Sequence, residues 1–221
     1  RNPAPFGAWL SLDGVTILSV SPERFLRLED RAVETRPIKG TRPRGLGPMH
    51  DEALGRELTE SEKDRAENVM IVDLLRNDLS RVCAPGTVRV PELFHLEQHP
   101  TVLHLVSTVT GTLRPAHRAA DLLRASFPGG SITGAPKVRA MEVIAELEPT
   151  QRGPYCGMIG YVSVTGTMDT SIAIRTGVVR DGTVYFSGGG GIVADSDPEL
   201  EYRETLHKVQ GIVRTLADRP A

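Results

Sequence analysis

Residues 155–187 read YCGMIGYVSVTGTMDTSIAIRTGVVRDGTVYFS and contain the clearest structural signal in the chain. β-Branched and aromatic residues recur there in short runs, and the pairs Thr165-Gly166 and Asp181-Gly182 are typical of tight hairpin turns. The pattern predicts three strands, at about 155–165, 169–180 and 183–187. We therefore expect strands joined by hairpins, and an antiparallel sheet, in this part of the chain.

Other segments extend the pattern in both directions. Residues 6–34 alternate in the manner of strands, and residues 87–90 and 102–112 also resemble strands. Helices are predicted from a cap at Ser61 to about residue 81, and over 117–126, 135–147 and 197–216. Hairpins mixed with helices indicate an α+β fold rather than a doubly wound parallel sheet.

Composition limits the classes of function. The chain has 221 residues, 39% of them hydrophobic, and a formal net charge of -2, which suits a folded protein. The charges are mixed without a basic stripe, so no nucleic-acid partner and no membrane partner is expected. The apolar runs are too short to span a bilayer. Cys83 and Cys156 form no metal-binding motif and fit a reducing compartment, so we expect a cytoplasmic protein.

The chain opens with RNPAP at residues 1–5 and lacks an initiating Met. Strand-like sequence follows almost at once, which suggests a piece of a longer protein. Removal of a tag, or processing of a complete protein, is the alternative.

A basic segment holds a candidate nucleophile. Residues 36–48 are rich in Pro and Gly, which predicts a loop, and we expect the segment 42–60 to be mobile. Lys39 lies in this segment, and a lysine becomes nucleophilic where burial or neighbouring cations lower its pKa. Three arginines could supply such cations, namely Arg36, Arg42 and Arg44. The alternative is an ordinary surface lysine.

Two acids lie near the start of the first long helix. Residues 69–75 are apolar almost all round, which predicts deep burial, and Asp64 and Glu67 share the apolar side of the helix. Inward carboxylates are costly unless paired, and Mg²⁺ is a suitable partner because it takes hard oxygen ligands. The alternative is that both acids stabilise the helix start and pair with Lys63 or Arg65.

A second acid pair lies in the last helix. Glu201 and Glu204 are three residues apart and share one face, away from the apolar stripe. Glu204 and Lys208 form a favourable i,i+4 pair. Taken alone, these residues favour a solvated face with a salt bridge over a metal site.

Two glycine-rich stretches precede helices. Residues 129–137 read GGSITGAPK, and residues 188–191 are four consecutive glycines. Such a loop at a helix N-terminus can hold an anion, either a carboxylate or a phosphate. Ala135-Pro136 interrupts the phosphate-loop pattern, so a nucleotide enzyme is disfavoured.

Two further side chains are candidates for a polar site. His104 lies in a strand-like run, where a lone histidine is either a satisfied core residue or a base. Arg175 lies in a predicted half-buried strand and requires an anionic partner, from the protein or from a substrate. Together with the acids and the glycine loops, they suit a small polyanion bound through a divalent metal.

Several motifs resemble, in their order, those of the chorismate-utilising enzymes. They are SPERF at 21–25, PIKGT at 37–41, DRAEN at 64–68, LLRND at 74–78, and the stretches 127–137, 169–176 and 188–195. The family includes anthranilate, aminodeoxychorismate, isochorismate and salicylate synthases. The match runs from end to end of the chain and corresponds to the C-terminal half of a typical member. It implies one catalytic domain, 1–221, in a four-layer α/β/β/α fold with orthogonally packed sheets, here without its N-terminal half.

The resemblance also implies a reaction. Aminodeoxychorismate synthases have Lys at the position of Lys39, whereas anthranilate synthases have Ala, so amination of chorismate at C4 is expected. Lys39 would add to C2 while the 4-hydroxyl leaves with a proton from Glu23, and ammonia would then attack C4 and expel the lysine. The product would be 4-amino-4-deoxychorismate, on the route to para-aminobenzoate and folate. His104 would lie against the reacting side of the ring.

Further roles are implied in the same way. Glu67 and Glu204 look like direct Mg²⁺ ligands, with Asp64 and Glu201 nearby or bridged by water. Substrate contacts would come from Thr41, Ser131, Lys137, Tyr155, Arg175, Gly189, Gly190 and Gly191. A separate glutaminase subunit would supply the ammonia. The alternatives are anthranilate synthesis and a non-catalytic fragment that binds chorismate or a glutaminase.

Overall fold

The long helix α2 (Glu62–Ser80) begins where the sequence predicts it, in a computed structural model that describes residues 4–217. The Ser61 hydroxyl accepts a hydrogen bond from the Asp64 N–H at 3.2 Å, which forms the expected cap. Ile71 and Leu75 are buried, but Val69 is 41% exposed. The prediction that 69–75 is deeply buried all round is therefore wrong, because only part of the α2 surface packs against the protein.

The chain forms two compact units. The larger comprises residues 23–149 and 160–171, and the smaller comprises residues 4–22, 150–159 and 172–217 of the described range. Both contain an antiparallel sheet and at least one helix, so the α+β prediction is confirmed. The prediction of one domain over 1–221 stays a prediction.

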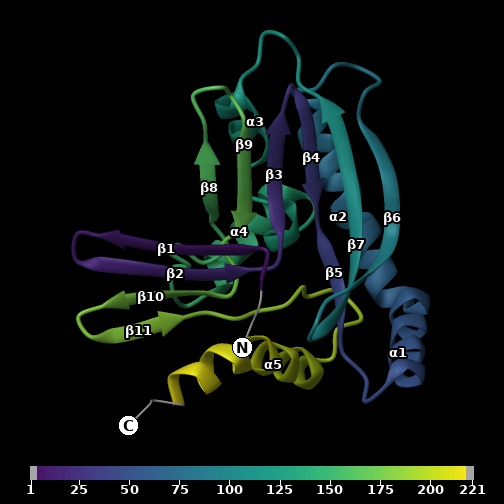
Figure 1. The fold of residues 1–221 in the computed structure, drawn as a ribbon, viewed down its shortest axis with the longest axis vertical. Coiled ribbons are helices and arrows are strands. Elements are labelled where there is room, and N and C mark those ends of the chain that lie inside the picture. Colours follow the sequence, from purple (N-terminus) through teal and green to yellow (C-terminus); the bar gives the residue numbers. More distant parts are fainter. Residues whose placement is uncertain (1–3, 218–221) are drawn as a thin grey trace. The chain divides into compact units, whose positions relative to one another are not determined.

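The larger unit is built on a seven-stranded sheet. Its order is β5-β7-β4-β3-β9-β8, and β6 also pairs with β7. The strands are β3 (Arg24–Glu29), β4 (Ala32–Arg36), β5 (Ile38–Pro43), β6 (Arg89–Gln98), β7 (Val102–Thr112), β8 (Met158–Val162) and β9 (Met168–Ile172). The helices are α1 (Pro48–Glu60), α2, α3 (Ala119–Ser126), the short η1 (Gly130–Ile132) and α4 (Lys137–Leu147). In Figure 1, α2 runs behind β4 and β7.

Strand β7 separates an apolar side of the sheet from a polar side. Leu103 and Leu105 pack in an apolar cluster with Leu58 of α1. His104, which lies between them, has the opposite orientation, and its ring bonds to the Thr41 hydroxyl of β5. The apolar side is covered by helices, and the polar side carries His104 and Thr41.

Two segments predicted as loop have regular structure. Ile38–Pro43 form β5, and Pro48–Glu60 form α1. Proline is favoured in the first turn of a helix, where its missing N–H costs nothing, and Leu58 at the other end of α1 is fully buried. The predicted loop at 36–48 is therefore wrong over β5, and the expected mobile loop at 42–60 is helical from Pro48 onward.

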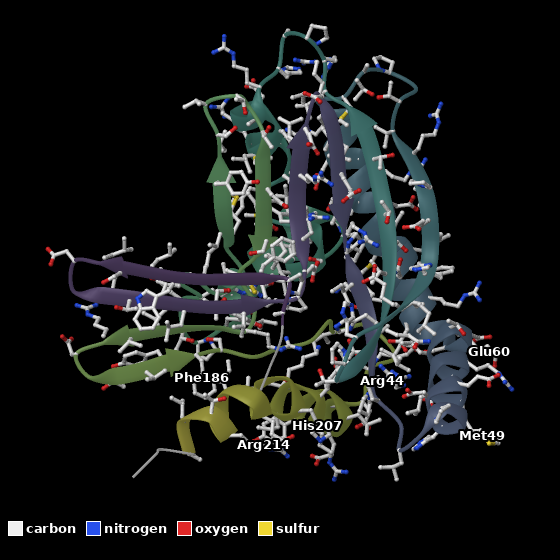
Figure 2. The ribbon with its side chains drawn as sticks, in the orientation of Figure 1. Arg44, Met49, Glu60, Phe186, His207 and Arg214 are labelled. Atoms are coloured by element: carbon white, nitrogen blue, oxygen red, sulfur yellow. The ribbon has the colours of Figure 1, made fainter. Side chains whose placement is uncertain are left out.

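The start of α1 is held by Asp51, and this predicts a pH dependence. Arg44, labelled in Figure 2, donates from Nε to Asp51 Oδ2 at 2.8 Å, and the Gly45 N–H donates to Asp51 Oδ1 at 2.6 Å. These bonds lower the pKa of Asp51 from 3.8 to about 2. A depressed carboxyl pKa stabilises the fold above about 3.8, and this contribution is lost as the pH falls towards 2. Asp51→Asn should therefore lower stability near neutral pH.

Urea unfolding at several pH values measures this effect. The difference between the wild type and Asp51→Asn should shrink steadily as the pH falls from about 4 to about 2. A difference that stays constant over this range would show that the Asp51 charge does not stabilise α1.

The smaller unit contains a four-stranded sheet in the order β1-β2-β10-β11. Its strands are β1 (Phe6–Leu12), β2 (Val15–Ser21), β10 (Thr176–Arg180) and β11 (Thr183–Phe186), and its helix is α5 (Pro198–Ala217). Asp197 caps α5, because its Oδ1 accepts from the Leu200 N–H at 2.9 Å. None of the helices described in the chain is long and apolar enough to cross a membrane.

The strand predicted over 169–180 is two strands. β9 belongs to the seven-stranded sheet and β10 to the four-stranded sheet. Between them, Arg175 has φ 53° and its carbonyl accepts from the Val20 N–H at 3.1 Å. The predicted position of Arg175 in a half-buried strand is therefore wrong, because a left-handed residue ends the extended run.

Candidate active site

Lys39 is held between an acid and a carbonyl. Its Nζ donates to Glu67 Oε1 at 2.9 Å and to the Ser131 backbone oxygen at 3.0 Å. The side chains of Lys39 and Glu67 are only 12% and 13% exposed. The alternative of an ordinary surface lysine is therefore wrong, and β5, α2 and η1 together fix the position of one amine.

The three arginines near Lys39 do not act as free cations. Arg36 pairs with Glu97, Arg42 pairs with Asp64 and Glu57, and Arg44 pairs with Asp51. Each guanidinium charge is thus largely compensated by its own carboxylate. The expectation that these arginines prepare Lys39 as a nucleophile stays a prediction.

Gly40 allows β5 to approach α2 closely. It has φ +85°, and a Cβ at this position would lie 2.7 Å from Leu58 Cδ1 and 3.0 Å from Asp64 Cγ. The same approach brings Arg42 Nη2 within 3.2 Å of Asp64 Oδ2. Glycine next to Lys39 therefore has a steric reason as well as a conformational one.

His104 is buried and oriented by Thr41. It is 6% exposed, and its Nδ1 lies 2.9 Å from the Thr41 hydroxyl oxygen. Its ring centroid is 5.3 Å from that of His99. The contact fixes the orientation of the imidazole, whatever its role in a reaction.

This contact supports a stability prediction. Thr41→Val keeps the shape of the side chain but leaves a buried ring nitrogen without this bond, so the free energy of unfolding should fall by about 1–3 kcal/mol. Thr110→Val is the matched control, because the Thr110 hydroxyl makes no hydrogen bond to the described residues and lies in the same sheet. Urea denaturation compares the two, and equal losses would rule out a specific role for the Thr41 hydroxyl.

Ser131 and Lys137 lie at the two ends of one short segment. The Ser131 carbonyl faces Lys39, whereas Lys137 Nζ donates to Asp78 Oδ2 at 2.6 Å and to the Ser126 carbonyl at 2.9 Å. Burial raises the pKa of the Asp78 carboxyl, and the charge of Lys137 opposes that shift. The ammonium of Lys137 is thus already paired inside the protein, and its predicted contact with a substrate stays a prediction.

Glu23 occupies the connection between β2 and β3 and is 5% exposed. Its predicted role as the acid stays a prediction.

The smaller unit brings two other predicted residue groups together. A Cβ placed at Gly189 would lie 3.1 Å from the Tyr155 hydroxyl, and one at Gly190 would lie 3.2 Å from Glu201 Oε2 and 3.7 Å from Glu204 Oε1. Only glycines leave the two carboxylates and the phenol this close to the loop backbone. Burial raises the pKa of Tyr155 well above its usual value, so the phenol stays protonated as a donor.

Lys208 and Ser196 hold these acids. Lys208 pairs with Glu204 and also donates to the Gly189 carbonyl at 3.3 Å, and Ser196 donates to Glu201 Oε1 at 2.6 Å. The expected Glu204–Lys208 pair is confirmed. Glu201 is only 6% exposed, so the expectation of a solvated face is wrong for this residue.

The carboxylate oxygens of the predicted acids are the kind of ligand that a hard divalent cation prefers. Glu201 and Glu204 present carboxylate oxygens to one stretch of loop, and Glu67 presents one beside Lys39. Among residues 4–217, no group of three or more His, Cys, Asp or Glu side chains is assembled as a metal site. The Mg²⁺ assignment of Asp64, Glu67, Glu201 and Glu204 therefore stays a prediction.

One depression of the described surface lies away from all of these residues. It has a volume of about 320 Å³ and is lined by residues of β3, β4 and β7, including Arg27, Glu34 and Thr110. None of the predicted site residues lines it, so the candidate residues are described by their own contacts, around Lys39 in the larger unit and around the glycine loop in the smaller unit.

Sequence reasoning missed Asp78 as a site-supporting residue. It is 3% exposed and pairs with Lys137, which is 59 residues away. Spacing offered a signal, since Asp78 follows Ile71 and Leu75 on the buried side of α2. An acid on such a stripe requires a partner, and only the structure identifies which cation it is.

The chain matches a family of known enzymes over most of its length. A family model described as chorismate binding enzyme matches residues 1–214. The chain belongs to this family of chorismate-binding enzymes.

The individual relatives include synthases with two different names. Aminodeoxychorismate synthase component 1 of Salmonella typhimurium is 59% identical over 97% of this chain and 47% of its own length. Anthranilate synthase component 1 of Streptomyces coelicolor is 54% identical over 96% of this chain and 42% of its own length. The structure of anthranilate synthase component I from Streptococcus pneumoniae matches with a TM-score of 0.86 and 39% identity, over 96% of this chain and 46% of that one. The chain thus spans about half the length of these relatives.

Proposed function

We propose that this chain is the chorismate-converting part of an enzyme that makes 4-amino-4-deoxychorismate from chorismate and ammonia, on the route to para-aminobenzoate and folate. The observation that carries the proposal is the placement of Lys39. Its amine is largely shielded from water and is directed by Glu67 and by the Ser131 carbonyl. The 59% identity to an aminodeoxychorismate synthase component supports the same reaction.

The reaction divides one displacement into two covalent steps. The neutral amine of Lys39 forms a bond to C2 of chorismate, the ring double bond shifts, and the 4-hydroxyl leaves as water with a proton from Glu23. Ammonia then forms a bond to C4, the double bond returns, and Lys39 leaves from C2 as a neutral amine, while the new C4 ammonium loses a proton that restores Glu23. The balance is chorismate plus ammonia to aminodeoxychorismate plus water.

The remaining residues hold the substrate in this proposal. Tyr155, Arg175 and the N–H groups of Gly189, Gly190 and Gly191 are donors for substrate carboxylates, as is the Ser131 hydroxyl. Thr41 keeps His104 in one orientation for its contact with the ring. Bound Mg²⁺ would supply a fixed positive charge for a substrate carboxylate, and Glu67, Glu201, Glu204 and Asp64 are the acids proposed to hold it.

The whole enzyme is proposed to have the four-layer α/β/β/α fold with orthogonally packed sheets, of which this chain supplies part. Ammonia is proposed to come from a separate glutaminase, and the numbered name of the relatives, component 1, supports a partner subunit. A cytoplasmic location is proposed because Cys83 and Cys156 are both buried free thiols.

Anthranilate synthesis is the second candidate, since a relative with that name is 54% identical. Lys39 argues against it, because that branch of the family is expected to have Ala at this position. Incubation of the full-length protein with chorismate, Mg²⁺ and ammonium, followed by mass spectrometry of the products, separates the two. Aminodeoxychorismate is the expected product, and anthranilate as the main product would overturn the proposal.

A further inference from the structure

We infer that Asp78 and Lys137 form a latch that positions the segment 127–136, and through it the Ser131 carbonyl that holds Lys39. The inference rests on the proposed function, and it makes Asp78 a positioning residue. It also reassigns Lys137 from a substrate contact to this latch.

Lys137 closes the segment on itself. It is the first residue of α4, and its Nζ reaches the carbonyl of Ser126, the last residue of α3, at 2.9 Å. The same Nζ lies 2.6 Å from Asp78 Oδ2 of α2, and the Lys137 and Asp78 side chains are 15% and 4% exposed. One ammonium therefore joins three helices at the point where the segment begins and ends.

Electrostatics favour a cation at this place. The last carbonyls of a helix lack partners within the helix and carry partial negative charge. Arg81 donates to the Ala125 carbonyl at 3.3 Å, beside the Lys137 bond to Ser126, so two cations meet the end of α3. The Asp78 carboxylate balances the more buried of them. Removing it would leave an ammonium with little access to water.

The segment 127–136 packs against α2, the helix that carries Asp78. A Cβ at Gly130 would lie 2.8 Å from Leu74 Cδ2, so the backbone there lies directly on α2. The next residue, Ser131, accepts the bond from Lys39.

The contacts of α2 with this region follow one stripe. Glu67, Leu74 and Asp78 are separated by seven and four residues, which places them on one face of the helix. Glu67 holds the Lys39 amine, Leu74 supports Gly130, and Asp78 holds Lys137. One face of α2 therefore contacts both the reacting amine and the segment whose Ser131 carbonyl binds it.

The test uses the full-length protein and four variants. Asp78→Asn and Lys137→Met each break the latch, and the double variant Asp78→Leu/Lys137→Met replaces it with apolar groups. Asp73→Asn is the matched control, because Asp73 lies on α2, is 62% exposed and pairs with Arg76 on the surface. Two readouts are taken: amide hydrogen exchange in residues 127–136, and kcat and KM for chorismate.

Both single variants should exchange faster in 127–136 and lose about tenfold or more in kcat, with KM changed less than about twofold. The double variant should recover most of the protection, and Asp73→Asn should match the wild type. If a single variant fails to fold, a folded and protected double variant still supports the latch, and a double variant as damaged as the singles overturns it.

Two other results would overturn the inference. One is unchanged exchange in 127–136 in both single variants. The other is a raised KM with unchanged kcat in Lys137→Met and no effect of Asp78→Asn, which would make Lys137 a direct substrate ligand. Hydrogen exchange requires no chorismate, so it tests the latch independently of the reaction. A wild type without amination activity would count against the proposed function, and the exchange data would still decide whether the latch exists.

Discussion

Replacing Lys39 by arginine is expected to lower the rate of chorismate amination by about 100-fold or more while the protein stays folded. Arginine keeps the positive charge beside Glu67, but its guanidinium stays protonated and cannot form the proposed bond to C2. Steady-state product formation, measured with ammonium as the nitrogen source, gives the size of the loss.

Lys39→Ala removes both the charge and the amine of Lys39, so its comparison with Lys39→Arg separates the two contributions. It should lose as much activity and also destabilise the fold, because Glu67 is only 13% exposed and loses its cation. Lys63→Ala is the control, since Lys63 lies exposed on the first turn of the same helix. Amination by Lys39→Arg at more than about a tenth of the wild-type rate would rule out Lys39 as the nucleophile.

Gly160→Ala is expected to lower the free energy of unfolding by about 3 kcal/mol or more. A Cβ at Gly160 would lie 2.2 Å from the Asp169 carbonyl oxygen and 2.6 Å from Thr170 Cα, so the backbones of β8 and β9 would have to separate. Asp169 resists such a movement because its Oδ1 accepts from Arg24 Nε at 3.1 Å. Urea denaturation monitored by circular dichroism measures the loss.

Gly7→Ala is the matched control for this variant. Gly7 is also a strand glycine, but nothing lies within 4 Å of its Cβ position, so its substitution should change stability by less than about 0.5 kcal/mol. Similar losses in both variants would mean that the close approach at Gly160 is relieved without cost.

Local sequence signals predicted much of the fold. The turn at Asp181-Gly182 is a clear case, since both residues have positive φ, as a tight hairpin with this dipeptide requires. The Ser61 cap at the start of α2 is another. These features depend on neighbouring residues alone, so a single sequence is enough to find them.

The errors arose where distant contacts decide the structure. Pro and Gly in 36–48 suggested a loop, but pairing with β7 makes 38–43 a strand, and burial of Leu58 stabilises α1. A helix-forming tendency is weak compared with such tertiary contacts. Nothing within the segment itself reports them.

In the candidate site, too, local features were predicted and distant partners were not. The spacing of Glu67 on α2 predicted an inward acid, which the structure confirms, but its partner Lys39 lies 28 residues away. The contact of Lys137 with Asp78 spans 59 residues and was missed for the same reason. Side-chain direction follows from helix periodicity, whereas the identity of a partner follows from the tertiary fold.

Intact-protein and peptide mass spectrometry after incubation with chorismate and Mg²⁺, without any ammonia source, tests the central claim most directly. The proposal predicts a peptide containing Lys39 whose mass is increased by that of chorismate less one water, and its disappearance when ammonium is added. The Lys39→Arg variant should show no such peptide. The quench conditions must preserve amine adducts. The claim would be contradicted if Lys39 stayed unmodified in a protein that converts chorismate to aminodeoxychorismate once ammonium is supplied.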